Sequence, residues 1–267
     1  MKNILLLIHD DAGQEARFQA ALDVTRALGG HLKCLDVTPL TVFPGDAYGS
    51  DGSVLMLEYE RTQEAANKAR LLQRLAVEDV SWEWSDITGG MEECIEQAAG
   101  LADLIVVNRQ LDEYPIPDMR NIASGLIVKS GVPVLAVPQD AKGFRVAGSA
   151  LVAWDGSPEA SSALTAAVPL LKLAGSVTIF EVEDGTVKSP ADEAASYLSR
   201  HDIHPVVVRE PAEHELTSGR VLAKANSRRF DYLVMGGFGH HRMTEALLGG
   251  VTRRMLTKSP IPLFLAH

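Results

Sequence analysis

The chain has 267 residues, of which 46% are hydrophobic and 22% are charged, and its formal net charge at pH 7 is −10. This length suits two domains of ordinary size, and the composition excludes an intrinsically disordered chain. The acidic balance argues against nucleic acid as a partner, since phosphate backbones are bound through clustered Lys and Arg side chains.

The first apolar run, Ile4–Ile8, is too short for the hydrophobic region of a signal peptide and predicts a β-strand. No apolar stretch approaches the roughly 20 residues that are needed to cross a bilayer. We therefore expect a cytoplasmic protein without a membrane partner. Two cysteines, Cys34 and Cys94, are predicted to be buried, reduced thiols and not parts of a disulfide or a metal site.

The second half of the chain repeats the pattern of the first. The first half has strand patterns at 4–8, 32–37, 103–107 and 131–137, with helical patterns at 15–28, 56–77 and 91–102. The second half has strand patterns at 150–154, 177–182, 231–235 and 260–266, with helical patterns at 160–173 and 216–229. The chain is therefore predicted to contain one α/β unit twice.

Strands that alternate with helices and are almost continuously apolar predict a parallel sheet that is covered on both faces. Each half is accordingly predicted to be a doubly wound α/β domain of about five strands. We place the two domains at residues 1–139 and 147–267, joined by a linker around Pro138–Gly143.

A glycine-rich segment follows the strand pattern at 231–235. Gly236 and Gly239 would let the backbone approach a phosphate, and Gly249-Gly250 precedes a helix whose first N–H groups are unpaired. The segment is not a Walker P-loop, because no Gly-Lys-Ser/Thr follows the glycines. It is also a poor dinucleotide fingerprint, because it follows a late strand. Spacing alone leaves open that the glycines form only a tight turn.

This segment closely resembles the Gly-x2-Gly-x9-Gly-Ser/Thr loop of nucleotide-binding universal stress proteins, with Gly236, Gly239 and Gly249 at the three glycine positions. Further matches cover nearly the whole chain and include His240, Leu247-Leu248, Val251-Thr252, Trp154-Asp155-Gly156-Ser157, Val182 and the strand at Pro262. The resemblance implies two tandem universal stress domains, related in fold to adenine nucleotide α-hydrolases. It also implies a pseudo-dimer through the closing strands Val132–Val137 and Ile261–Ala266, which would cover two exposed apolar edges.

The resemblance implies an ATP site, with or without Mg²⁺, in the second domain. It assigns Asp155 to the nucleoside, Val182 to the adenine, and five residues to the phosphates: Gly236, Gly239, Gly249, Gly250 and Thr252. Gly250 departs from the family pattern, which has Ser or Thr at this position. One hydroxyl donor is then missing, so we expect weaker binding by about 0.5–1.5 kcal/mol without loss of the binding mode.

The corresponding positions of the first half differ. Asp155, Gly236, Gly239, Gly249 and Gly250 align with His9, Asn108, Leu111, Arg120 and Asn121, although a shift of one residue would bring Asp10 opposite Asp155. Pro115 and Pro117 within this stretch donate no N–H group. The first domain is therefore expected to be degenerate, and the chain to bind one nucleotide.

The function predicted in this way is that of an ATP-binding regulatory protein of the cellular stress response, with an unidentified protein partner. The alternative is an interaction module of the same fold that binds no nucleotide. No catalytic constellation is visible, so the chain is expected to be at most a slow ATPase. His240-His241 lacks a third metal ligand at helical spacing, and Arg253 and Arg254 are either solvated or near the phosphates. Whether the whole chain dimerises is left open.

Overall fold

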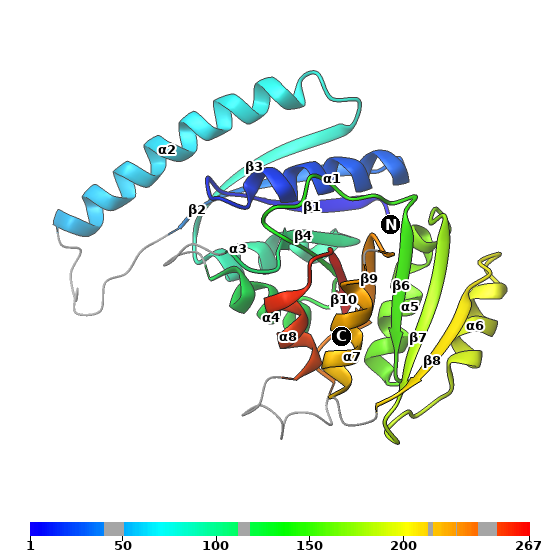
Figure 1. The fold of residues 1–267 in the computed structure, drawn as a ribbon. Helices are drawn as coiled ribbons and strands as arrows, with labels where there is room; N and C mark the ends of the chain where they lie inside the picture. The colour runs from blue at the N-terminus through cyan, green and yellow to red at the C-terminus, as the bar shows by residue number, and fades with distance from the viewer. Residues whose placement is uncertain (40–50, 112–117, 213–215, 228, 240–249) are drawn as a thin grey trace.

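The computed structural model describes residues 1–39, 51–111, 118–212, 216–227, 229–239 and 250–267 (Figure 1). The elements of the first half are β1 (Asn3–Ile8), α1 (Gln14–Leu28), β2 (His31–Pro39), α2 (Asp51–Leu75), β3 (Ser81–Gly89), α3 (Met91–Ala98), the 3-10 helix η1 (Ala99–Leu101), β4 (Leu104–Asn108), α4 (Met119–Lys129) and β5 (Val134–Val137). Those of the second half are β6 (Ser149–Trp154), α5 (Pro158–Leu171), β7 (Ser176–Glu183), α6 (Ala191–Ser199), β8 (Val206–Pro211), α7 (Thr217–Ala225), β9 (Tyr232–Gly236), α8 (Val251–Lys258) and β10 (Leu263–Ala266).

The strands of the described residues form one ten-stranded sheet in the order β3-β2-β1-β4-β5-β10-β9-β6-β7-β8. Neighbouring strands within each half run parallel, whereas β5 and β10 run antiparallel, with Leu263 opposite Ala136. Both halves therefore have the same doubly wound strand order. The predicted pseudo-dimer through the two closing strands is confirmed.

Both faces of the sheet are buried, as the continuous apolar strands predict. Alternate side chains of β1 enter two different core clusters: Ile4, Leu6 and Ile8 belong to one, and Leu5 and Leu7 to the other. All five are fully buried. Because successive strand residues point to opposite faces, a strand covered on both sides has no polar positions left.

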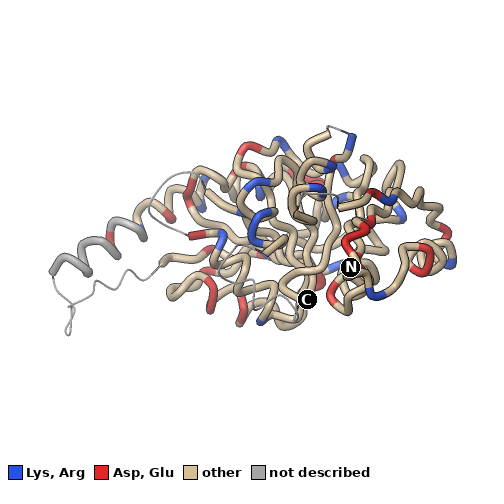
Figure 2. Tube along the Cα trace, turned by 60° about the horizontal axis from the view of Figure 1, so that its bottom comes forward, with Lys and Arg blue, Asp and Glu red and all other residues tan. Residues whose placement is uncertain are grey.

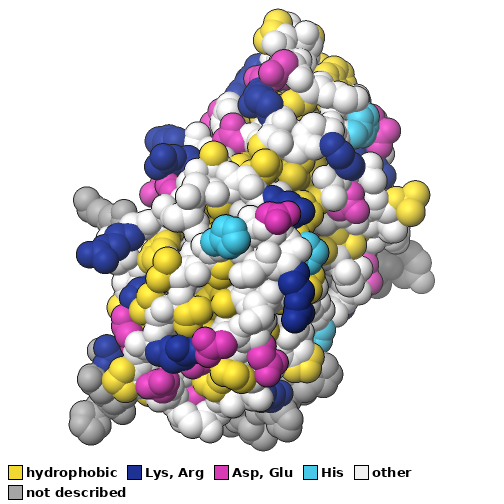
Figure 3. All heavy atoms as spheres, turned by 90° about the vertical axis from the view of Figure 1, so that its right-hand side faces the viewer, with side chains coloured by type: hydrophobic (Ala, Val, Ile, Leu, Met, Phe, Trp, Pro, Cys, Tyr) yellow, Lys and Arg dark blue, Asp and Glu magenta, His cyan; other side chains and the backbone are white. Residues whose placement is uncertain are grey.

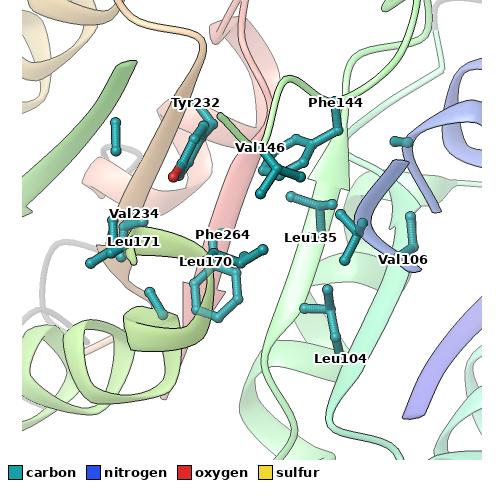
Figure 4. Packing of buried hydrophobic residues seen from close by; sticks show 14 of the residues in the cluster. Leu104, Val106, Leu135, Phe144, Val146, Leu170, Leu171, Tyr232, Val234 and Phe264 are labelled. Atoms are coloured by element: carbon teal, nitrogen blue, oxygen red, sulfur yellow. The ribbon is translucent and has the colours of Figure 1, made fainter. Parts of the chain in front are cut away.

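The core continues across the junction of the two halves (Figure 4). Phe264 of β10 lies opposite Leu135 of β5, and both side chains are fully buried. Phe144, from the segment between the halves, packs on Tyr232 of β9 with ring centroids 4.9 Å apart. Truncating Phe264 to Ala would cost roughly 3–5 kcal/mol, as for other core aromatic residues. The halves are thus joined by shared core packing as well as by a strand pair.

The sheet edges are where the sequence pattern is least informative. Edge strand β3 has half-buried and exposed residues along its whole length, and the same holds for β8 at the other edge. β3 has no continuous apolar run and β8 has only Val206–Val208, so the sequence pattern predicts neither strand. The predicted helix at 91–102 is divided into α3 and η1, and the one at 216–229 is the shorter α7.

Two further features concern the surface and the thiols. Charged residues occur along the described trace (Figure 2), and on the face of α6 and β8 basic and acidic side chains lie beside each other (Figure 3).

Cys34 and Cys94 are buried and unpaired, and burial raises the pKa of Cys34 to about 12. Among the described residues, no helix combines the length and apolarity needed to span a membrane.

Candidate functional site

A cavity of about 540 Å³ lies at the carboxyl ends of β6, β7 and β9. Its lining includes six residues of the sequence-predicted site: Asp155, Val182, Gly236, Gly239, Gly250 and Thr252. The seventh, Gly249, lies outside the described residues. These positions are far apart in sequence and meet because parallel strands deliver their carboxyl ends to one edge of the sheet.

The turn from β6 into α5 holds Asp155 at the cavity. One carboxylate oxygen of Asp155 accepts a hydrogen bond from the backbone N–H of Ser157 (3.0 Å), and the Ser157 hydroxyl caps α5 by accepting from the N–H of Ala160 (3.1 Å). Gly156 between them has φ 70°, and a Cβ there would lie 2.1 Å from the backbone N of Ser189. Only glycine fits this turn, so the Asp155 carboxylate is held by local backbone geometry.

The glycine loop after β9 turns in a way that the sequence did not predict. The left-handed residue is Phe238, with φ 53°, whereas neither Gly236 nor Gly239 has a positive φ. The two glycines instead allow close approach to α5. A Cβ on Gly236 would lie 2.6 Å from the backbone N of Ala160, and one on Gly239 would lie 3.2 Å from a carboxylate oxygen of Glu159.

The N-terminus of α8 forms the other side of this loop. Gly250 is the N-cap and makes no side-chain cap, and a Cβ at this position would have no neighbour within 4 Å among the residues that the structure describes. Space therefore remains beside the first N–H groups of the helix. Thr252 is 7% exposed, and its hydroxyl accepts a hydrogen bond from the N–H of Phe238 (3.1 Å). The Thr252 side chain thus ties the glycine loop to α8, and its O–H can still donate to a ligand.

The opposite end of the cavity is apolar. The side formed by β7 and α7, away from the glycine loop, is lined by Phe180, Val182 and Val221. Ala153 of β6 and Met235 of β9 are further apolar lining residues, and Met235 directly precedes Gly236. The indole N–H of Trp154 is directed to the backbone carbonyl of Ser189 (2.8 Å). One end of the cavity thus offers apolar side chains, and the other offers backbone N–H groups.

Charged side chains of both signs line the cavity, and sequence reasoning did not assign most of them. Glu159 and Asp184 are acidic, and Lys188 and Arg253 are basic. Asp184 accepts hydrogen bonds from the hydroxyls of Thr186 (2.6 Å) and Thr217. Of these four residues, the sequence indicates only Arg253, as a residue that is either solvated or near the phosphates. Glu159 lies in the first turn of α5, where acidic residues are common, and this position is the signal that could have pointed to it.

Residues 148–267 match the model of the Universal stress protein family. A curated universal stress protein of Synechocystis sp. (strain PCC 6803) is 24% identical over 301 residues that cover 98% of each chain. Residues 148–267 therefore form a domain of the universal stress protein family. A solved universal stress protein of Archaeoglobus fulgidus DSM 4304 has the same fold, with a TM-score of 0.76, 20% identity, and coverage of 100% of this chain and 98% of that chain.

In the first half of the chain, side chains fill the position that is equivalent to Gly236. Asn108, at the end of β4, is fully buried and donates from its amide to the carbonyl oxygen of Gly13 (3.1 Å). A Cβ on Gly13 would lie 2.5 Å from both the Asn108 Oδ1 and the Leu111 Cδ2 atoms. Tyr114, Pro115 and Pro117 lie outside the described residues. That the first half binds no nucleotide stays a prediction.

His9 occupies the place of Asp155 in the first half and forms an ion pair with Glu64 of α2 at 2.5 Å. Burial alone would lower the pKa of His9, but the hydrogen bond and the charge of Glu64 outweigh burial, and the pKa is raised. Arg17, fully buried beside it, donates to Asp11 (2.6 Å), Asn108 (2.6 Å) and the carbonyl of His9 (2.6 Å). The polar side chains of His9, Arg17 and Asn108 thus bind to other groups of the first half.

Within the described part of the chain, no three His, Cys, Asp or Glu side chains are grouped as metal ligands. The candidate ligands His240 and His241 lie outside that part.

Proposed function

We propose that this universal stress protein binds one ATP molecule in the cavity of its second half and acts as a nucleotide-dependent regulatory protein in the stress response. The observation that carries the proposal is that six residues, predicted from sequence alone, line one cavity. The cavity is of a size suited to a nucleotide, and it combines apolar walls with a few convergent polar groups.

The chemistry of the two ends gives the orientation of the nucleotide. Val182 and Val221 would pack on the adenine, and the Asp155 carboxylate would accept hydrogen bonds from the ribose hydroxyls. The phosphates would lie along Gly236–Gly239 and before the N-terminus of α8, where unpaired N–H groups and the helix dipole favour an anion. The open space at Gly250 supports this assignment, because a phosphate needs the volume that a side chain would otherwise occupy.

The proposal includes several finer points. The two domains are residues 1–139 and 147–267, and the protein acts in the cytoplasm. ATP binds with or without Mg²⁺. The chain works by binding and hydrolyses ATP slowly, if at all. An unidentified protein partner would read the bound state. The alternative is an interaction module of the same fold, in which the glycine loop serves only as a turn.

Analysis of the small molecules released by heat from the purified chain separates these two functions. Absorbance and mass spectrometry are expected to detect an adenine nucleotide. Gly239→Val should abolish ATP binding, measured by calorimetry, because the side chain would enter the phosphate space. Gly236 is unsuitable for this test, since a side chain there would collide with the backbone of α5. The matched control is Gly100→Val, at an exposed glycine whose Cβ position has nothing within 4 Å. Unchanged affinity in Gly239→Val would contradict the phosphate-loop assignment.

A further inference from the structure

One side of the nucleotide cavity belongs to the first half of the chain. Asn121, Ser124 and Val128 of α4 line the cavity together with residues of the second half. Their spacing of three and four residues places them on one face of the helix. The cavity is therefore built from both halves, although every residue that the sequence assigned to it lies in the second.

The position of α4 beside the cavity is fixed by packing between the halves. A Cβ on Gly237 would lie 2.5 Å from Cγ2 of Ile127, so the absence of a side chain at Gly237 lets α4 approach the end of β9. Ile127 is 1% exposed and belongs to the core cluster that spans both halves. Nearby, the Arg109 guanidinium donates to the carbonyl oxygens of Leu256 (3.0 Å) and Thr257 (2.8 Å) in α8. These contacts are all within the chain, so the position of α4 beside the cavity does not depend on a bound ligand.

The sheet order shows which end of the cavity α4 adjoins. Ile127 packs at Gly237, directly after Gly236, so α4 lies at the glycine-loop end. Val182 and Val221 belong to β7 and α7, and β7 is separated from β9 by β6. The polar face of α4 is thus on the side of the cavity where the phosphates are proposed to bind, away from the apolar end.

The polar groups of this face are hydrogen-bond donors. The Asn121 amide has two N–H bonds and gives one hydrogen bond to Asp118 (2.6 Å), which leaves a second donor. The Ser124 hydroxyl donates to the carbonyl of Arg120 within the helix (2.7 Å). Rotation of this hydroxyl would exchange a neutral hydrogen bond for one to a charged oxygen, which is the stronger kind.

We propose that Asn121 and Ser124 of the first half donate hydrogen bonds to the terminal phosphates of the nucleotide bound in the second half. The proposal rests on the proposed function and adds a role for the first half in recognising the ligand. It makes the chain discriminate between nucleoside triphosphates and monophosphates, because a monophosphate has no groups that reach α4. The first half then contributes to binding without a nucleotide site of its own.

Calorimetric titration of the full chain with ATP and with AMP tests this role. Ser124→Asp places a carboxylate beside the terminal phosphates, so ATP is expected to bind about tenfold more weakly or worse, while AMP affinity changes by less than about twofold. Lys129→Ala is the matched control: it also makes the chain one charge more negative, and it lies on α4 outside the cavity lining. The control is expected to leave both affinities unchanged.

A double variant, Asn121→Ala with Ser124→Ala, removes the donors without adding charge and decides the question if Ser124→Asp does not fold. It should weaken ATP several-fold and leave AMP unchanged. Unchanged ATP affinity in both folded variants, or equal loss for ATP and AMP, would overturn the role of α4 while leaving the proposed function intact. Failure of the unaltered chain to bind ATP would overturn both.

Discussion

Asn108 lies against Gly13 in the first half, with its amide nitrogen 3.1 Å from the glycine carbonyl oxygen. The second half has the reverse arrangement, because Gly236 replaces Asn108 and Glu159 replaces Gly13 in the repeat. In each half one of the two facing residues must be glycine, since a Cβ on Gly13 or Gly236 would lie 2.5 or 2.6 Å from its neighbour. The halves have the same fold, but the glycine stands at the start of the helix in the first half (Gly13) and at the end of the strand in the second half (Gly236).

The buried Arg17 of the first half is predicted to be essential for stability. Replacing Arg17 by Met should cost roughly 3–5 kcal/mol, because the change leaves Asp11 buried without its cation partner. Chemical denaturation measures the loss. Arg26→Met is the matched control, since Arg26 is 41% exposed at the side chain and its ion pairs are worth about 0–1 kcal/mol in solvent. Equal effects of the two substitutions would contradict this account of the cluster.

Gly250 offers a test that separates helix capping from ligand binding. Gly250→Ser should tighten ATP binding several-fold by supplying a hydroxyl donor, while it stabilises the free protein by only a few tenths of a kcal/mol. Gly250→Asp caps the helix about as well but should weaken ATP binding, because its carboxylate would face the phosphates. Thermal unfolding without ligand and calorimetry with ATP distinguish the two effects. Similar ATP affinities in both variants would place the phosphates elsewhere.

The stability of the protein is predicted to depend on the protonation of Asp36. Burial, followed by the charges of Glu64 and Asp86, raises the pKa of Asp36 to about 7. In the unfolded chain this carboxyl titrates near about 3.9. Between about pH 4 and pH 7 the folded state therefore retains a proton that the unfolded state has released, and the free energy of unfolding falls as pH rises through this range.

Asp36→Asn removes this titration. The variant should be more stable than the unaltered protein by about 1–3 kcal/mol at pH 8, and the difference should shrink towards pH 4. Lys68, which attracts the carboxylate, reduces the effect, as does His9. Denaturant titrations at pH 4.5, 6 and 8 give the comparison. If the stability gained by Asp36→Asn were smaller at pH 8 than at pH 4.5, the predicted direction of the pH dependence would be wrong.

The proposed boundary at residue 147 can be tested through the strand junction. Residues 147–267 expressed alone would expose β10, whose residues are buried by β5 in the full chain. We expect a soluble homodimer in which two β10 strands pair antiparallel, since an exposed apolar edge favours pairing. Light scattering after gel filtration gives the mass. A stable monomer would show that the second half does not need this pairing.

The sequence predicted the parts of the molecule that follow from local pattern. The continuous apolar run at Ile4–Ile8 predicts a buried strand, and the repeat assigns the same role to 150–154. The glycines and Asp155 could be assigned because the motifs that contain them resemble those of universal stress proteins. Asn121 and Ser124 could not, because their place at the cavity depends on the packing of Ile127 against Gly237, which is far away along the chain. The left-handed Phe238 likewise gives no signal in its residue type.

Calorimetric titration of the unaltered, nucleotide-free chain with ATP tests the central claim most directly. One ATP per chain is the predicted result, because only the second half has the glycine pattern that resembles the phosphate loop of universal stress proteins. Two equivalent sites would contradict the assignment of the first half as filled, and no binding would contradict the proposed function itself.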